Sequence, residues 1–270
     1  MSGSFSADWL TLREPFDRAA RDVGLAEKLA AWSAQREALD VVDLGSGTGS
    51  MRRWLAPRLH VAQRWRLVER DRALIAVGKQ QLDAAEAGYV QADLVADLES
   101  LVLPSTGLVT ASALVDLVSE AWAKRLARAV VRAGAALYLT LTYDGAIDLD
   151  PADGFDLAVT SLVNRHQTQD KGFGPALGPR AHAGFLNLLE PASGTLLTAS
   201  SPWVIEAGGL AMQRALIEGW AAAAVETESD AQADIRAWQG RRLAVVDVAR
   251  RACASAMETF YGCRGGYRPP

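Results

Sequence analysis

The stretch Val41-Val42-Asp43-Leu44-Gly45-Ser46-Gly47-Thr48-Gly49-Ser50 constrains this chain most, because an apolar run ends in an acid and continues into a loop with glycine at every second position. Glycine has no Cβ and tolerates positive φ, so such a loop brings backbone amides close to a ligand. A helix that begins near Ser50 would direct its positive end toward the same ligand. The segment therefore predicts a binding loop for a nucleoside-like cofactor. The alternative is a simple tight turn between a strand and a helix.

The residues around the glycines distinguish between nucleotide-binding folds. In the dinucleotide-binding fingerprint a third glycine stands three residues after the second, and that position is Ser50. Instead, an acid, Asp43, stands two residues before the first glycine. The form Asp-Leu-Gly-x-Gly-x-Gly resembles motif I of class I S-adenosylmethionine-dependent methyltransferases. This resemblance implies that Asp43 helps to hold the amino acid end of the cofactor.

Three later segments resemble further parts of that family in the same order. Arg66–Asp71 resembles its second strand, and the two oxygens of Glu69 suit the two hydroxyls of a ribose. Tyr89–Leu94 resembles the third strand, which implies that Asp93 contacts the adenine amino group. Gly107–Leu117 resembles the fourth strand and the turn that flanks cofactor and substrate. The alternative for Glu69, Asp93 and Asp116 is that they are ordinary strand-end or helix-capping acids.

Periodicity predicts helices over Leu12–Arg36 and then alternating strands and helices to about Gly145. The strands are expected at Asp40–Leu44, Arg66–Glu69, Tyr89–Ala92, Leu108–Ala111 and Ala135–Thr142, and the helices start near Gly49, Arg72 and Ser119, with Gly134 ending the last. The alternation predicts a parallel sheet. With the resemblance, which covers roughly residues 39–143, the fold class is α/β, with a doubly wound, mainly parallel, seven-stranded sheet. The glycine loop, Glu69, Asp93, Ala113 and Tyr143 fall at the carboxyl edge, where ligands of such sheets collect.

We expect one domain over residues 1–270. Its parts are an N-terminal helical cap (1–38), a cofactor-binding core (39–143), an insertion or lid for the acceptor (144–193), the last strands and C-terminal helices (194–262), and a tail (263–270). A sixth strand is expected at Thr195–Ala199, and a helical region at Gly208–Phe260 in which Trp220 and Trp238 pack.

The insertion carries a dense polar segment, Asn164–Pro179. Three glycines and two prolines in the eight residues after Lys171 predict a defined loop. Helical spacing places His166 and Asp170 on one face. We expect His166 to act as a general base that Asp170 orients, and Lys171 or Arg165 to bind an anionic group of the substrate. The alternative is a His–Asp helix pair with a solvated lysine beside a surface loop.

The candidate site residues fall into three groups. Those expected at the cofactor are Arg13, Asp43, Gly45, Ser46, Gly47, Gly49, Glu69, Arg70, Asp93, Leu94, Ala111, Ser112 and Ala113. Those expected at the acceptor are Asp116, Arg165, Gln167, Lys171 and Trp203, and those expected to be catalytic are His166, Asp170 and Tyr143. Arg13 is expected to close over the cofactor carboxylate; a surface salt bridge with Asp17 is the alternative.

Charge and composition favour a small-molecule acceptor. The net charge of −4 and the pI near 5.5 give no electrostatic reason to expect nucleic acid as a partner. Residues 1–10 lack the features of a signal peptide and no apolar run is long enough to span a membrane, so we expect a cytoplasmic protein. We expect it to be a monomer or a homodimer. Cys253 and Cys263 have no zinc-site spacing, so we expect free thiols and no metal.

The function expected from the resemblance is transfer of a methyl group from S-adenosylmethionine to a small molecule by in-line displacement, with S-adenosylhomocysteine as product. Because the sulfonium methyl is already activated, alignment matters most, and a base matters only if the acceptor must lose a proton. Oxygen, nitrogen and carbon acceptors all fit. Two alternatives stay open: a nicotinamide-dependent oxidoreductase, which Ser50 and Asp43 disfavour, and a non-catalytic S-adenosylmethionine-binding module, which the polar insertion disfavours.

Overall fold

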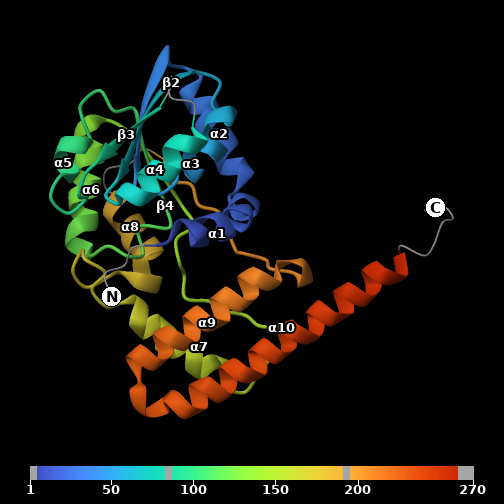
Figure 1. Cartoon of the computed structure of the whole chain (residues 1–270). Helices are drawn as coiled ribbons and strands as arrows, with labels where there is room; N and C mark the ends of the chain where they lie inside the picture. The colour runs from blue at the N-terminus through green and yellow to red at the C-terminus, as the bar shows by residue number, and fades with distance from the viewer. Residues whose placement is uncertain (1–4, 83–86, 191–194, 261–270) are drawn as a thin grey trace. The chain divides into compact units, whose positions relative to one another are not determined.

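The chain forms two compact units in the computed structural model, which describes residues 5–82, 87–190 and 195–260. The first unit comprises Met1–Ala146 and Gln167–Trp203, and the second comprises Ile147–His166 and Val204–Pro270 (Figure 1). The expected insertion at residues 144–193 is thus divided, with residues 147–166 in the second unit and the rest in the first. The tail at residues 263–270 lies outside the described residues.

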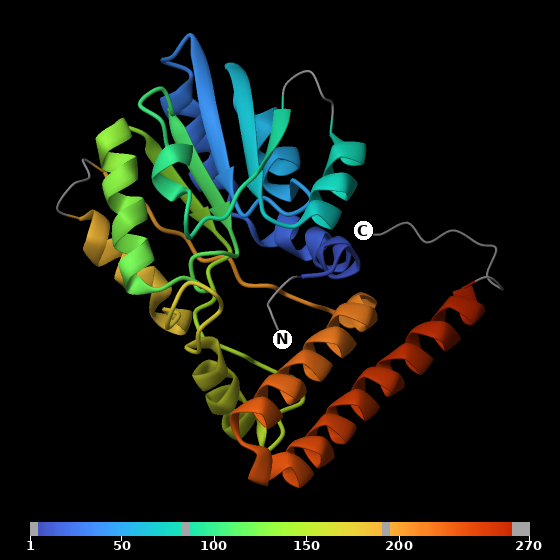
Figure 2. The ribbon, with the colours of Figure 1, turned by 60° about the vertical axis from the view of Figure 1, so that its left-hand side comes forward.

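A five-stranded parallel sheet forms the centre of the first unit (Figure 2). Its strands are β1 (Ala38–Leu44), β2 (Ala62–Glu69), β3 (Ala87–Gln91), β4 (Leu108–Ser112) and β5 (Ala136–Thr140). The spatial order β3-β2-β1-β4-β5 confirms the doubly wound α/β class. Because β1 pairs with both β2 and β4, the winding direction reverses beside β1, and its carboxyl end is the expected place for a ligand.

Three parts of the strand prediction are wrong. The described residues form five strands rather than seven, and residues 195–206 form neither strand nor helix. Leu196 and Leu197 are 38% and 55% exposed, so the apolar side chains that suggested a strand at Thr195–Ala199 have no sheet face to cover them. The fifth strand ends at Thr140 rather than Thr142, because Leu141 adopts a positive φ of 58°.

Side-chain caps and glycine set the helix boundaries of the first unit. Its helices are α1 (Ala7–Ala20), α2 (Val23–Ser33), α3 (Ser50–Leu55), η1 (Ala56–Arg58), α4 (Arg72–Gln81), α5 (Leu98–Leu101), α6 (Glu120–Ala133), η2 (Gly178–Arg180) and α8 (Ala181–Leu189). Asp71 accepts a hydrogen bond from the Ala73 amide at 2.7 Å and starts α4, and Ser119 caps α6 in the same way. Gly134, with φ of 63°, ends α6 as predicted.

Helices cover both faces of the sheet because successive strand residues point to opposite sides. Val41 and Leu67 belong to one buried cluster with Trp54 of α3. Their neighbours Val42 and Val68 belong to a second cluster with α6 and α8. Figure 1 shows α5, α6 and α8 on one side of the sheet and α2, α3 and α4 on the other. This two-sided cover buries most of β1 and β4 and leaves their carboxyl ends as the place where a ligand can reach the central strands, whereas the edge strand β3 stays partly exposed.

The second unit is helical. It consists of α7 (Asp156–Gln167, with its last residue in the first unit), η3 (Ala207–Gly209), α9 (Leu210–Thr227), η4 (Ser229–Ala231) and α10 (Gln232–Phe260). Asp156 accepts hydrogen bonds from the indole of Trp238 at 2.8 Å and from Nε of Arg242 at 2.9 Å, which ties α7 to α10. The packing role expected for Trp238 is confirmed, because its side chain is buried among Val163 and Ile217. No helix in the described ranges is long and apolar enough to cross a membrane.

Replacement of Gly78 should destabilise the first unit. A Cβ at this buried α4 position would stand 1.9 Å from the hydroxyl oxygen of Tyr89, which donates a hydrogen bond to the Gly47 carbonyl at 3.1 Å. We expect Gly78→Ala to lower the free energy of unfolding by roughly 1–3 kcal/mol, less the gain in helix propensity. Urea denaturation measures the change. The control is Gly184→Ala in α8, whose Cβ would meet Leu177 at an ordinary 3.6 Å; equal stability of the two variants would contradict the prediction.

Candidate functional site

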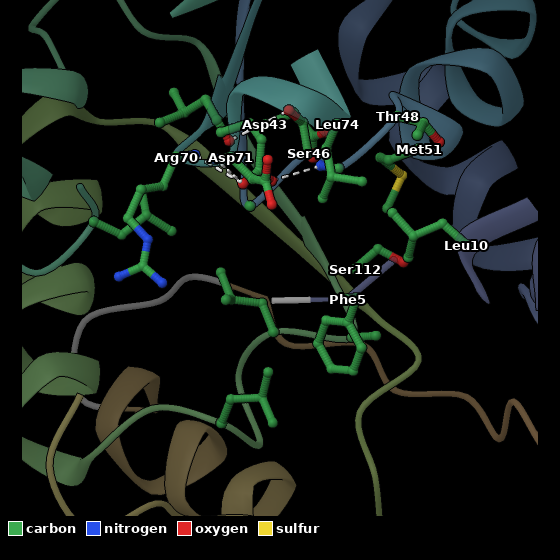
Figure 3. A pocket seen from close by; sticks show the side chains of 18 of the residues that line it. Phe5, Leu10, Asp43, Ser46, Thr48, Met51, Arg70, Asp71, Leu74 and Ser112 are labelled. Atoms are coloured by element: carbon green, nitrogen blue, oxygen red, sulfur yellow. Dashed lines mark hydrogen bonds between the residues drawn. The ribbon is translucent and has the colours of Figure 1, made fainter. Parts of the chain in front are cut away.

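A cavity of about 330 Å³ lies at the carboxyl ends of β1 to β4 in the first unit. Figure 3 shows Asp43, Ser46 and Asp71 on one side of this cavity and Phe5 on the opposite side. The candidate cofactor residues that line it are Arg13, Asp43, Gly45, Ser46, Gly47, Glu69, Arg70, Asp93, Leu94, Ser112 and Ala113. Most of the expected cofactor set is therefore brought together on one surface.

The glycine loop has the predicted backbone. Gly45, Gly47 and Gly49 have φ values of 64°, 53° and 86°, a region that other residues adopt only with strain. The Ser46 amide donates a hydrogen bond to the Val68 carbonyl at 2.9 Å, which ties the loop to β2, and α3 begins at Ser50 as expected. Gly49 is the exception among the expected contacts. It caps α3 beside Leu82 and the Tyr89 hydroxyl and does not line the cavity.

Asp43 is an almost fully buried carboxylate, with 1% of its surface exposed. Its Oδ1 accepts a hydrogen bond from the Thr110 hydroxyl at 2.7 Å, and its Oδ2 has no hydrogen-bond partner among the described residues. Burial raises the pKa of Asp43 to about 7, against the lowering effects of the Thr110 hydrogen bond and the Arg21 cation. A buried carboxylate oxygen in this state is a natural partner for a cationic ligand group.

Glu69 connects the glycine loop to the turn after β2. Its Oε2 accepts a hydrogen bond from the Gly47 amide at 2.9 Å, and its Oε1 accepts from the amides of Arg70 and Asp71 at 2.8 and 2.9 Å. A carboxylate offers about four lone-pair positions, so about one stays available to a ligand. One ribose hydroxyl can bind directly, and a second must replace a loop amide.

The acids Asp71 and Asp93 both cap turns and line the cavity. Asp93 accepts a hydrogen bond from the Val95 amide at 2.8 Å, and its Oδ2 lies 3.9 Å from Nη1 of Arg70. The capping alternative for Asp93 is thus observed, and it does not exclude contact with a ligand, because Asp93 and Asp71 both form part of the cavity wall.

The end of β4 contributes Ser112 and Ala113. Ala113 has a positive φ of 51°, which costs on the order of 1 kcal/mol or more in a residue other than glycine, and its amide donates to the Thr140 carbonyl at 2.9 Å. Ala111 is buried in the core and does not line the cavity, contrary to the expected cofactor contact. The strained backbone therefore turns the chain at the cavity edge one residue after the strand.

Asp116 and Tyr143 lie beside the carboxyl ends of β4 and β5. Asp116 is buried, its Oδ1 has no partner in the described structure, and burial raises its pKa to about 6. Burial, with the carboxylates of Asp144 and Asp116, raises the pKa of Tyr143 to about 12. The Tyr143 hydroxyl thus keeps its proton at neutral pH and suits a hydrogen-bond donor rather than a base. Neither residue is among the described lining residues.

Arg13, Asp17 and Trp203 form one connected group. Nε of Arg13 lies 3.0 Å from Oδ2 of Asp17, the Trp203 indole donates to Oδ1 of Asp17 at 3.1 Å, and the Arg13 guanidinium lies 4.8 Å from the Trp203 ring centroid. The salt bridge with Asp17, which was the alternative for Arg13, is present, but it is not a surface pair, because the two side chains are only 12% and 6% exposed. Arg13 and Asp17 line the cavity, and Trp203 holds both.

The glycine-rich part of the expected lid forms a wall of the cavity. Lys171, Gly172 and Phe173 line it. The Asp170 carboxylate accepts hydrogen bonds from the amides of Gly172 and Gly174 at 2.7 and 2.9 Å and so shapes this loop. The loop is attached to the segment after β4, because the Leu177 amide donates to the Val118 carbonyl at 2.8 Å and Phe173 packs edge-on against Trp122.

The expected pairing of His166 with Asp170 on one helix face is wrong, because α7 ends at Gln167. Nε2 of His166 instead lies 3.1 Å from Oε2 of Glu226 within the second unit. Nη2 of Arg165 donates to the Thr227 carbonyl at 3.2 Å in the same unit. Arg165, His166 and Gln167 are not among the described residues that line the cavity. The role of His166 as a base stays a prediction.

Sequence reasoning missed most of the apolar lining. These residues are Phe5, Leu10, Met51, Val68, Leu74, Ala92, Val95, Leu114, Leu117 and Phe173. Val68, Ala92, Leu114, Leu117 and Phe173 lie in segments that the sequence analysis names, whereas Phe5, Leu10, Met51, Leu74 and Val95 give no separate signal. No group of three or more His, Cys, Asp or Glu within the described part of the chain is placed to hold a metal ion. Cys263 and the side chain of Cys253 lie outside it.

No protein-family model and no curated protein sequence matches this chain. Similar solved structures include an S-adenosylmethionine-dependent methyltransferase from Mesorhizobium loti, at 20% identity and a TM-score of 0.33, over 52% of this chain and 56% of that one. A second is human N-acetylserotonin methyltransferase in complex with S-adenosylmethionine, at 12% identity and a TM-score of 0.43, over 73% of this chain and 52% of that one. A third is an S-adenosylmethionine-dependent methyltransferase from Aquifex aeolicus, at 11% identity and a TM-score of 0.43, over 73% of this chain and 92% of that one.

The chain spans only about half the length of the first two of these proteins. Because these TM-scores lie below 0.5, the likenesses carry no weight for the activity. The assignment of the fold rests on the strand order, and that of the function rests on the site.

The pKa of Asp43 makes the stability of the ligand-free protein depend on pH. Because the folded-state pKa of about 7 exceeds the ordinary value of 3.8, the native state binds the proton more tightly, and its stability falls as pH rises between these values. Asn cannot titrate, so Asp43→Asn lacks this loss of stability. We expect the free energy of unfolding of the variant minus that of the wild type to increase by a few kcal/mol, in order of magnitude, between about pH 4.5 and about pH 8. Urea denaturation at several pH values measures the difference, and a difference that is constant with pH would refute the prediction.

Proposed function

We propose that this protein binds S-adenosylmethionine and transfers its methyl group to a small-molecule acceptor. One observation carries the proposal: the glycine loop and the acids Asp43, Glu69 and Asp93 line a single cavity at the carboxyl ends of the first three strands. These are the positions that the sequence resemblance predicts for the cofactor. The parallel sheet supports this assignment, because its strand ends converge where the winding reverses.

The residues present fit each part of the cofactor. The unpartnered Oδ2 of Asp43, within the described structure, suits the α-ammonium group, and Gly45 and Gly47 allow close approach of the backbone. Glu69 has a lone pair for a ribose hydroxyl, and Asp93 can accept from the adenine amino group. When bound, S-adenosylmethionine supplies a methyl group that is already activated, so the protein's main task is to position the acceptor.

The acceptor side is inferred from the remaining lining. Leu117 and Phe173 offer apolar surface, and Arg13 and Lys171 add polar groups that can orient a substrate. Tyr143, which keeps its proton at neutral pH, suits donation of a hydrogen bond rather than proton removal. The net charge of −4 favours a small molecule over nucleic acid.

Calorimetric titration with S-adenosylhomocysteine tests the cofactor. We expect saturable binding by the wild type and binding that is weaker by about ten- to a hundredfold in Glu69→Gln, because a hydrogen bond to a charged group contributes about 1.5–3 kcal/mol. Gln keeps one acceptor oxygen for the loop amides, so the loop is less disturbed than with Ala. The control is Glu99→Gln, whose carboxylate pairs with Arg125 at 2.7 Å outside the cavity.

The same titration separates the rival functions. Binding of NADH in place of S-adenosylhomocysteine would favour the oxidoreductase, and absence of binding by the wild type would refute the proposed cofactor. A non-catalytic module would bind the cofactor but would release no S-adenosylhomocysteine from S-adenosylmethionine in the presence of a panel of acceptors.

Binding should also depend on pH through Asp43. The carboxylate must be ionised to pair with an ammonium group, and its pKa in the ligand-free protein is about 7. We therefore expect affinity for S-adenosylhomocysteine to rise from about pH 6 to about pH 8. Below the pKa of Asp43 the rise should be up to about tenfold per pH unit, and binding at the lower pH should release a proton. The matched ligand is 5′-methylthioadenosine, which lacks the amino acid end and should bind independently of pH. An identical pH dependence for the two ligands, or its persistence in Asp43→Asn, would exclude this role.

A further inference from the structure

Arg21, the residue that ends α1, is a buried cation behind the wall of the cavity. Its side chain is 2% exposed, and its Nη2 donates to the hydroxyls of Ser50 and Ser112 at 3.2 and 3.0 Å. Both serines line the cavity, whereas Arg21 does not. Its Nε and Nη1 have no hydrogen-bond partner in the described part of the chain.

Packing alone does not explain a charge at this position. The Arg21 guanidinium lies 5.7 Å from the Trp54 ring centroid, and an apolar side chain would fill the same space without loss of hydration. Two neutral hydroxyls compensate a buried cation only in part. Burial lowers the pKa of Arg21, yet an arginine keeps its charge at neutral pH, so the guanidinium requires a negative partner.

Three acids act on Arg21 electrostatically: Asp17, Asp43 and Glu14. Two of them already have cationic partners. Asp17 is paired with Arg13 at 3.0 Å, and Glu14 is paired with Arg53 at 2.5 Å. Within the described part of the chain, the Asp43 side chain has only the hydroxyl of Thr110 as a hydrogen-bond partner. Asp17 has the largest effect of the three on Arg21. Arg21 also bonds to Ser112, which lies on the same face of β4 as Thr110, the hydrogen-bond partner of Asp43. Asp43 is thus the nearby acid that has no ion-pair partner of its own among the described residues.

The groups that act on Asp43 from the neighbouring elements are few. Thr110 on β4 donates a hydrogen bond, Glu69 on β2 is a like charge that opposes ionisation, and Tyr89 on β3 carries a neutral hydroxyl. Among the described residues, Arg21 is the one cation that acts on Asp43. Without it, burial and Glu69 would both favour the protonated acid, which offers no charge to a ligand.

We propose that Arg21 is a positioning residue of this site, whose buried guanidinium favours the ionised form of Asp43 that receives the cationic end of the ligand. The inference rests on the proposed function, since it is S-adenosylmethionine whose α-ammonium group Asp43 would receive. It assigns to α1, outside the recognisable motifs, the control of ligand affinity near neutral pH.

The test compares the pH profile of S-adenosylhomocysteine binding in the wild type, Arg21→Met and Arg21→Lys by calorimetry. Loss of the cation should move the midpoint of the profile upward by about one pH unit or more. Affinity at about pH 7 should then fall by about fivefold or more in Arg21→Met, while affinity for 5′-methylthioadenosine changes little. Arg21→Lys keeps the charge and should keep the wild-type midpoint.

Several results would overturn the proposal. The first is a pH profile of Arg21→Met with the same midpoint as that of the wild type. The second is an equal loss of affinity for both ligands at every pH. The third is a midpoint that shifts as far in Arg21→Lys as in Arg21→Met. If Arg21→Met does not fold, Arg21→Gln, which retains a donor for the two serines, serves as the neutral variant.

A second measurement separates this inference from the proposed function. The pKa of Asp43 in the ligand-free protein can be followed by carboxyl-carbon NMR, with the signal assigned from Asp43→Asn. A higher pKa of Asp43 in the neutral Arg21 variants supports the effect of Arg21 on Asp43, whether or not the wild type binds S-adenosylhomocysteine. Absence of binding by the wild type would refute the proposed function alone. An unchanged pKa would overturn the inference whatever the protein binds.

Discussion

The carboxylate of Asp43 lies inside a parallel sheet that helices cover on both faces, and this placement constrains the rest of the site. β1 is the central strand, so Asp43 has β2 and β4 as immediate neighbours and is removed from water. A charge in such a place is costly unless a partner or a ligand compensates it. Thr110 supplies one hydrogen bond and Arg21 supplies a cation, while Oδ2 has no hydrogen-bond partner among the described residues. The site therefore retains a destabilising group where a cationic ligand would be received.

The loop that follows Asp43 is fixed by contacts with β2 rather than by glycine alone. The Ser46 amide bonds to the Val68 carbonyl, the Gly47 amide bonds to Glu69, and the Tyr89 hydroxyl bonds to the Gly47 carbonyl. Glycine permits the positive φ values, and these hydrogen bonds select one conformation from those that glycine allows. A loop that is already ordered loses less conformational entropy when a ligand binds. The same hydrogen bonds occupy most acceptor positions of Glu69, which limits how many ribose hydroxyls it can receive.

The sequence predicted the five strands and the acids at their carboxyl ends, because strand periodicity and capping are local signals. Asp71 and Ser119 start helices where their side chains predict it. The errors concern features that depend on distant neighbours. A strand at 195–199 would need an adjacent strand to pair with, and the pairing of His166 with Asp170 would need α7 to continue past Gln167. Most of the apolar lining residues and the division into two units have no local signature. Arginine is seldom fully buried, so Arg21 at the C-cap of α1 gives no sign in the sequence that it lies behind a cavity.

Arg13 on α1 and Arg21 at the C-cap of this helix have different partners, which give them different roles. Arg13 is paired with Asp17 and stacks on Trp203, so it contributes shape and hydrogen-bond donors to the cavity with little net charge. The side chain of Arg21, two turns further on, bonds only to hydroxyls among the described residues, and its charge acts on both Asp17 and Asp43. The motif residues at the strand ends provide the contacts for a nucleoside and its amino acid end. The charge state in which the central acid meets that ligand depends on α1, a segment that carries none of the motifs from which the site was recognised.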